Sequence, residues 1–195
     1  MSQNRSGLFD YMDVDDFEEL LADMPHDERW ELIGGRVIKM MVGARWQHNV
    51  IIQNLGGALR QRFRAQGSDC RTYTETFYMK AVKLKTSTLP DVIVRCGQLS
   101  EDATSLDDPR VLIEVVSPGS EKRDHVEKWK LYRQIPSLAH YVLVERDRPA
   151  IDVLDRSGDA WAVRRTIEGL DSMLNLPAVQ VSVPLREIYE DVFSA

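Results

Sequence analysis

Two short segments of this chain are apolar at almost every position: the runs VLIEVV at 111–116 and YVLV at 141–144. A strand with one face in water alternates apolar and polar residues, so continuous apolar runs indicate strands that are covered on both faces. Helical patterns lie before the first run and between the two runs. This order predicts an α/β fold with a mixed central β-sheet flanked by helices.

Periodicity and turn residues place the other elements. The longest helical pattern is Trp46–Arg64, in which apolar residues recur at three-to-four spacing. Gly34 and Gly35 mark a tight hairpin within WELIGGRVIKMMV. Further helices are expected at 13–23, 123–134 and 185–193, and further strands at 70–80, 89–96, 151–154 and 161–166.

The length of 195 residues, with 43% hydrophobic content, is enough for one domain with a substantial core. We expect an acidic helical segment over 1–28 and a single domain over 29–195. No apolar run approaches the ~20 residues that cross a bilayer, and MSQNRSGLFDYMDVDD lacks the pattern of a signal peptide. The sequence therefore predicts a cytosolic protein with no membrane partner.

The two cysteines, Cys70 and Cys96, lie far apart in the sequence and belong to no CxxC or Cys/His cluster. This spacing argues against a thiolate metal site and does not require a disulfide. We interpret both as small buried hydrophobic side chains.

The net charge of -6 is unevenly distributed. Residues 1–32 hold ten acidic side chains and two arginines, whereas residues 43–85 hold eight basic side chains and two acidic ones. The second segment could present a basic surface to nucleic acid, with Arg60 and Arg64 as candidate contacts. The alternative is an ordinary solvated helix and hairpin, because the protein as a whole is acidic.

Charged residues stand where packing alone would place apolar ones. Glu114 interrupts the run VLIEVV, and an ionised carboxylate buried without a partner costs several kcal/mol. Asp91 directly follows Pro90, which fits only the edge or start of a strand. Two carboxylates on neighbouring strands suit a shared Mg²⁺ ion. The alternatives are a turn carboxylate at Asp91 and an ion pair between Glu114 and Lys128 or an arginine.

Lys128 shares a helical face with apolar residues. At ~100° per residue, Asp124, Lys128, Tyr132 and Ile135 fall within one arc of about 80°, while Lys130 points elsewhere. An inward lysine could orient an attacking water or stabilise charge that grows on a phosphate.

At these residues the sequence resembles the Uma-two family of bacterial endonucleases, within the PD-(D/E)xK restriction-endonuclease-like superfamily. The segments that carry the resemblance are WELIGGRVIKM, the helix start near His48, LPDVIV, VLIEVVSP, DHVEKWKLY and AHYVLVE. The resemblance covers most of residues 30–190. It implies a restriction-endonuclease-like core made of a helix, a three-stranded meander, a second helix and a final strand.

The resemblance also implies roles for individual residues. Asp91 matches the motif aspartate and Glu114 the motif (D/E) residue, but Val116 stands where the motif has lysine. Lys128 on the following helix resembles the family's replacement for that lysine. The remaining implied residues are Glu31 and the Val115 carbonyl as metal ligands, His48 as a phosphate or metal contact, and Asp124 and Tyr132 as positioning groups.

Together these patterns predict an endonuclease that hydrolyses DNA phosphodiester bonds with Mg²⁺, or with Mn²⁺ in its place. The alternative is a catalytically inactive, nuclease-like protein that binds nucleic acid or acts as a scaffold. A serine hydrolase that uses Ser117 or Ser120 is disfavoured, because no Gly-x-Ser-x-Gly elbow is present. The sequence leaves open whether the substrate is DNA or RNA and whether the chain forms a homodimer.

Overall fold

The computed structural model describes residues 11–25, 27–40, 45–116 and 123–193, with the side chains of 123–125 outside that description. The helices are α1 (Val14–Ala22), α2 (Trp46–Ala65), the π-helical turn η3 (Arg123–Lys128), α3 (Trp129–Tyr132) and α4 (Leu185–Ile188), with 3-10 turns η2 (Val82–Leu84) and η4 (Pro177–Val179). None of the helices in these ranges is long and apolar enough to span a membrane.

The central sheet has the strand order β11-β10-β9-β8-β6-β3, and β12 pairs with β10. Its strands are β3 (Cys70–Thr74), β6 (Val92–Cys96), β8 (Val111–Val116), β9 (His140–Glu145), β10 (Ala150–Ser157), β11 (Ala160–Trp161) and β12 (Arg165–Glu168). Within this sheet the described pairs are antiparallel except β8 with β9, which are parallel and are joined through η3 and α3. The mixed sheet and the predicted order of helix, meander, helix and strand are confirmed.

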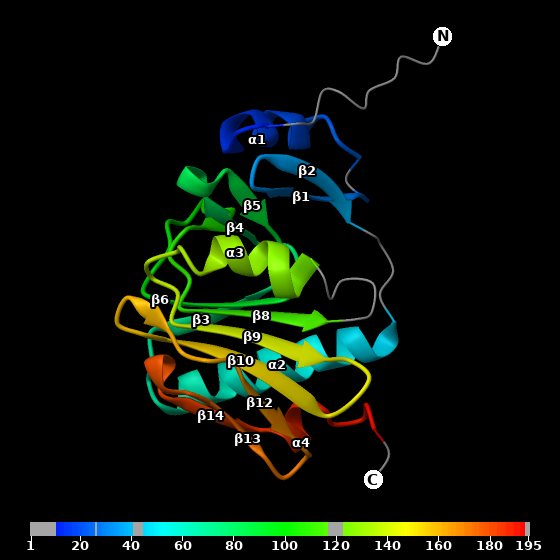
Figure 1. The fold of residues 1–195 in the computed structure, drawn as a ribbon, viewed down its shortest axis with the longest axis vertical. Helices are drawn as coiled ribbons and strands as arrows, with labels where there is room; N and C mark the ends of the chain where they lie inside the picture. Colours follow the sequence, from blue (N-terminus) through cyan, green and yellow to red (C-terminus); the bar gives the residue numbers. More distant parts are fainter. Residues whose placement is uncertain (1–10, 26, 41–44, 117–122, 194–195) are drawn as a thin grey trace.

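A smaller sheet lies beyond α3 (Figure 1), with the order β2-β1-β5-β4-β7. Its strands are β1 (Arg29–Ile33), β2 (Arg36–Met40), β4 (Tyr78–Ala81), β5 (Thr86–Thr88) and β7 (Ser105–Leu106). Helix α1 covers the β1–β2 hairpin through Phe17, which packs with the buried Leu32. This sheet brings β1 and β5 toward the end of β8, and each of these two strands supplies a polar side chain there.

The two faces of the central sheet carry separate apolar clusters, because side chains alternate along each strand. In β8, Val111, Ile113 and Val115 pack with α2 and the C-terminal hairpin. Leu112 and Val116 belong to the cluster on the opposite face, which includes Tyr132 of α3. Glu114 shares its alternation with Leu112 and Val116, so its side chain emerges on the α3 face.

Several element boundaries differ from the sequence prediction. The strand expected at 70–80 is divided into β3 and β4, which belong to different sheets, because Glu75 between them has a φ of 54°. The helix expected at 123–134 is a π-helical turn followed by one α-helical turn. The hairpin of β13 (Met173–Leu176) and β14 (Val181–Pro184) was not predicted.

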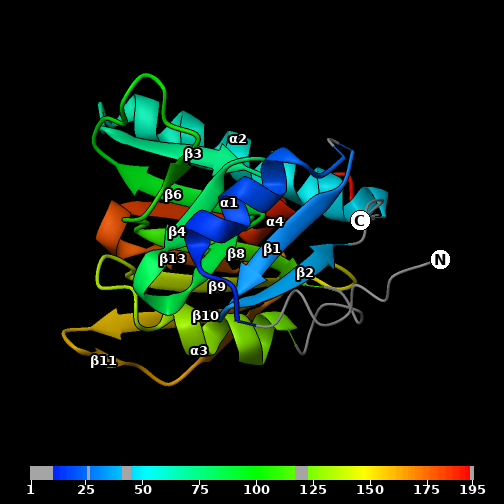
Figure 2. The ribbon, with the colours of Figure 1, turned by 90° about the horizontal axis from the view of Figure 1, so that it is seen from above.

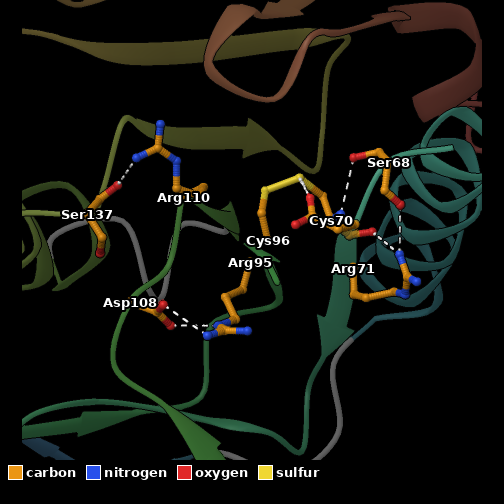
Figure 3. The surroundings of a disulfide bond; sticks show 9 residues. Ser68, Cys70, Arg71, Arg95, Cys96, Asp108, Arg110 and Ser137 are labelled. Carbon is orange, nitrogen blue, oxygen red and sulfur yellow. Dashed lines mark hydrogen bonds and ion pairs between the residues drawn. A yellow bond between two sulfur atoms is a disulfide. The ribbon is translucent and has the colours of Figure 1, made fainter. Parts of the chain in front are cut away.

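The interpretation of the cysteines as separate hydrophobic side chains is wrong, because Cys70 and Cys96 form a disulfide (Figure 3). The antiparallel register of β3 and β6 places these two residues directly opposite each other. Their separation of 26 residues hid this pairing in the sequence. The disulfide fastens the edge strand β3 to the sheet at the end remote from Asp91.

Candidate active site

The register of β6 and β8 brings Asp91 and Glu114 to the same end of the sheet. Val92 pairs with Ile113, so the next positions along the two antiparallel strands are Asp91 and Glu114. The backbone N–H of Val115 donates a hydrogen bond of 2.7 Å to Asp91 Oδ2. Asp91 directly precedes β6 and Glu114 lies in β8, so the predicted placement at one end of adjacent strands is confirmed, whereas a shared ion stays a prediction.

Lys128 lies between two buried carboxylates. Its Nζ is 2.9 Å from Glu114 Oε1 and 3.1 Å from Glu31 Oε1. All three side chains are at most 5% exposed, whereas Lys130 two residues later is exposed. The predicted helical phase is therefore confirmed, and the ammonium group supplies the counter-charge that a carboxylate inside an apolar strand requires.

Hydrogen bonds from neighbouring elements fix this cluster. Tyr132 donates its hydroxyl to Glu114 Oε1 at 3.4 Å and lies 2.8 Å from Thr88 Oγ1. The backbone N–H of Leu89 donates to Glu31 Oε1 at 2.9 Å. Complete burial raises the pKa of Tyr132 well above its usual value, and the negative charge of Glu114 acts in the same direction. Tyr132 is therefore a neutral phenol at all physiological pH values, and its hydroxyl acts as a hydrogen-bond donor to Glu114.

His48 approaches Asp91 from the first turn of α2. Its Nε2 is 3.3 Å from Asp91 Oδ2, and both side chains are 17% exposed. Burial opposes protonation of the imidazole, but the hydrogen bond and charge of Asp91 outweigh it and raise the pKa of His48. A protonated His48 places positive charge at the partly open end of the cluster, where a phosphate could bind.

Two buried polar atoms at this site have no hydrogen-bond partner within the described part of the chain: Glu31 Oε2 and His48 Nδ1. Such atoms are costly unless another group satisfies them. The oxygen donors of Glu31, Asp91 and Glu114 are the type that Mg²⁺ and Mn²⁺ prefer. The donor set and the unused carboxylate oxygen therefore fit a hard divalent cation.

Glu31 and Glu114, however, are arranged around Lys128. Among the described residues, the only histidine, cysteine and carboxylate group with three ligand atoms mutually within 4.8 Å is Asp69, Cys70 and Cys96, whose sulfurs form the disulfide. Binding of an ion by Glu31, Asp91 and Glu114 therefore requires their side chains to move closer together.

Other predicted site residues lie away from this cluster or outside the residues that the structure describes. Arg60 and Arg64 lie near the C-terminal end of α2, whereas His48 is at its N-terminal end. The side chain of Asp124, and Ser117 and Ser120, lie outside the described residues. Val115 contributes its N–H to Asp91, and a role for its carbonyl stays a prediction.

Sequence reasoning missed Thr88 and the Leu89 amide, which complete the cluster. Thr88 is fully buried on β5 and contacts Tyr132. The segment TSTLPD gave one signal, since Thr88 and Leu89 directly precede the Pro90–Asp91 pair. Their contacts depend on the pairing of β5 with β1 across 54 intervening residues, which no local pattern reveals.

Comparisons with known proteins place this geometry in context. The family model Uma2, described as "Putative restriction endonuclease", matches residues 14–186. The uncharacterized protein slr1290 of Synechocystis sp. is 28% identical over 163 residues, covering 83% of this chain and 84% of that protein. A crystal structure titled as a putative nuclease belonging to DUF820 from Anabaena variabilis superposes with a TM-score of 0.71 at 14% identity, covering 90% of this chain and 98% of that one. The solved structure supports the restriction-endonuclease-like fold, and the family match shows that this chain belongs to the Uma2 family of nuclease-like proteins.

Proposed function

We propose that this protein is an endonuclease that hydrolyses DNA phosphodiester bonds with Mg²⁺, and that Mn²⁺ can replace Mg²⁺. The observation that carries the proposal is the burial of Glu31, Glu114 and Lys128 together beside Asp91. Packing alone gives no reason to place three charged side chains there, and an apolar cluster of similar volume would be at least as stable. Membership of the Uma2 family supports the same reaction class.

The residues divide into ion-binding and substrate-facing groups. Glu31, Asp91 and Glu114 would hold the ion once their side chains move closer together, because all three stand at the same end of the central sheet. When bound, Mg²⁺ would supply Lewis-acid polarisation of the phosphodiester and a more acidic water. The two-point contact of Lys128 with Glu31 and Glu114 fixes its ammonium group, so this charge can orient the attacking water and stabilise the phosphate.

Tyr132 and His48 would complete the site. The Tyr132 phenol donates to Glu114 and restricts that carboxylate to one orientation. His48 is partly exposed beside Asp91, and its raised pKa favours the imidazolium form. An imidazolium at this position would bind a phosphate oxygen of the substrate by a charge-assisted hydrogen bond.

A second candidate function is a nuclease-like protein that binds nucleic acid or acts as a scaffold without turnover. The specific observation in its favour is that Lys128 already supplies the positive charge that Glu31 and Glu114 require. A divalent cation would then be unnecessary for folding. The two candidates differ in whether Lys128 shares the carboxylates with a metal or takes its place.

A plasmid-cleavage assay separates the two functions. Purified protein with Mg²⁺ or Mn²⁺ should convert supercoiled DNA to nicked or linear forms, and EDTA should stop the reaction. Glu114→Gln should abolish cleavage while retaining DNA binding. Binding without cleavage of either DNA or RNA by the wild-type protein would support the inactive alternative.

A further inference from the structure

Helix α2 carries a polar stripe that the proposed active site does not use. The helix is 20 residues long and contains no aspartate or glutamate. At ~100° per residue, five exposed polar or glycine positions fall within one arc of about 80° on the flank of α2 away from the core, an arc that they share with the exposed Trp46. These positions are Asn49, Gln53, Gly57, Arg60 and Arg64. Figure 2 shows α2 beside β3, the edge strand of the central sheet.

The two arginines of this stripe lack counter-charges. Arg62 on the same helix contacts Glu187 at 2.9 Å and donates to the Ser182 carbonyl. Within the described part of the chain, neither the Arg60 nor the Arg64 side chain makes a hydrogen bond or ion pair, although this protein has more acidic than basic residues. Unpaired guanidinium groups are therefore concentrated at one end of α2.

Both arginines line a hollow of about 520 Å³ between the end of α2 and β3. Arg71 of β3 lines the same hollow, and its Nη1 donates to the carbonyls of Ser68 and Cys70 (Figure 3). These bonds hold the Arg71 guanidinium without neutralising its charge. The adjacent Asp69 lines a second, smaller hollow together with Arg71. Three guanidinium groups around one concave surface are suited to a phosphate ligand.

Gly57 in the middle of the stripe has no packing explanation. A Cβ at Gly57 would meet no atom within 4 Å, whereas a Cβ at Gly56 would contact the Thr74 side chain at 3.5 Å. Glycine inside a helix lowers its stability relative to alanine. An exposed helical glycine between the proposed active site and the arginine hollow would allow a ligand backbone to approach α2 closely.

We propose that the hollow lined by Arg60, Arg64 and Arg71 binds a backbone phosphate of duplex DNA remote from the cleaved bond. This inference rests on the proposed function for its ligand. Arg60 and Arg64 lie twelve and sixteen residues after His48, which corresponds to roughly 18–24 Å along the helix axis. At ~3.4 Å per base pair, this distance spans about five to seven base pairs. Because His48 lies about 140° around the helix from the centre of the stripe, this axial distance is a minimum, and a duplex must extend at least about half a turn beyond the cleavage position to reach the hollow.

Fluorescence anisotropy in EDTA tests the inference, because binding is then measured without cleavage. The probes are a duplex of about 20 base pairs and a hairpin with a stem of about four base pairs, too short to span both sites. For Arg60→Gln/Arg64→Gln, we expect at least about tenfold weaker binding of the long duplex and a salt slope reduced by about 2. Binding of the short hairpin should stay unchanged.

Matched variants control for the loss of two positive charges and test the role of Gly57. Lys130→Gln/Arg133→Gln removes two exposed charges from the α3 face and should leave both affinities unchanged. Gly57→Glu should weaken long-duplex binding, whereas Gly57→Ala should have a smaller effect.

Equal losses on both probes, no loss on the long duplex, or absence of wild-type DNA binding would each overturn the inference. Loss of pyrophosphate binding in the arginine variant with unchanged duplex binding would assign the hollow to a small anion instead. If the length-dependent loss appears but wild-type protein cleaves no DNA with Mg²⁺ or Mn²⁺, only the proposed nuclease function fails.

Discussion

Two buried charged clusters in this protein differ in how completely their polar atoms are used. In the cluster around His140, Nδ1 donates to Asp155 Oδ1 at 2.7 Å, and Nε2 accepts from the Ala178 N–H at 3.2 Å. Arg165 donates to the second oxygen of Asp155 at 2.9 Å. This cluster ties β9, β10, β12 and η4 together, and both nitrogens of its histidine have partners.

The cluster around Lys128 is more deeply buried than the cluster around His140, in which Asp155 and Arg165 are part-exposed, but its polar atoms are incompletely satisfied. Glu31 directs Oε1 to Lys128 and to the Leu89 amide, whereas its Oε2 has no hydrogen-bond partner in the described ranges. His48 likewise uses only one of its two ring nitrogens. A structural cluster that uses its polar groups stabilises the fold, whereas one that leaves them unused retains capacity for a ligand. The comparison therefore supports a structural role for the His140 cluster and the proposed ligand-binding role for Glu31 and His48.

The largest difference between the two clusters should appear in catalysis. Lys128→Gln removes the ammonium charge but keeps a hydrogen-bond donor, so plasmid cleavage should fall by about 10²-fold or more. Lys130→Gln is the control, since this side chain is exposed two residues away. Equal cleavage by both variants would show that the positive charge for catalysis comes from elsewhere.

Truncation of Lys128 should also reduce stability. Lys128→Ala leaves Glu31 and Glu114 buried together without the ammonium group, which should lower the free energy of unfolding by about 3–5 kcal/mol in EDTA. Urea denaturation measures this change, and Lys130→Ala should remain within about 0.5 kcal/mol of wild type. A Lys128→Ala variant as stable as wild type would show that another cation already compensates the carboxylates.

Substitution in the His140 cluster should affect stability alone. His140→Ala removes the partner of Asp155 Oδ1 and of the Ala178 N–H, which should cost about 1–3 kcal/mol in the free energy of unfolding. Cleavage per folded molecule should stay at the wild-type value. A specific loss of cleavage without a loss of stability would contradict the structural role of this cluster.

The smallest expected effect is an opposite pH dependence of the two histidines. Burial lowers the pKa of His140 and outweighs the attraction of Asp155, so its stabilising contribution is present above pH ~6.5 and is lost as pH falls. The pKa of His48 is raised, so its contribution is complete below pH ~6.5 and is lost as pH rises through the folded-state value. Urea denaturation between about pH 5.5 and 8 should show that the stability difference from wild type shrinks with falling pH for His140→Gln and grows for His48→Gln. Parallel trends would show that one of the two environments is misassigned.

The sequence predicted the central sheet and the cluster's charged residues because each leaves a local signal. Continuous apolar runs marked β8 and β9, and Glu114 was conspicuous because it interrupted one of them. Lys128 followed from the helical phase of a single segment, which holds although its first part is π-helical.

Features that depend on long-range pairing were not predictable in this way. The Cys70–Cys96 disulfide, the break between β3 and β4, and the contact of Thr88 with Tyr132 each require strands to be registered across many intervening residues. The hairpin of β13 and β14 was missed for a related reason. Its strands are four residues long and alternate exposed with buried positions, a weak pattern over so short a length.

Calorimetric titration of the DNA-free protein with Mn²⁺ or Mg²⁺ measures whether Glu114 and its neighbours bind a divalent cation, as we propose. We expect saturable binding to the wild-type protein and a loss of at least about tenfold in affinity for Glu114→Gln, since outer-shell changes at metal sites already cost that much. Glu168→Gln, an exposed carboxylate on β12 paired with Arg148, is the matched control and should bind as wild type does. Equal affinity of wild type and Glu114→Gln, or no binding by either protein, would contradict the claim and leave Lys128 as the permanent cation of the cluster.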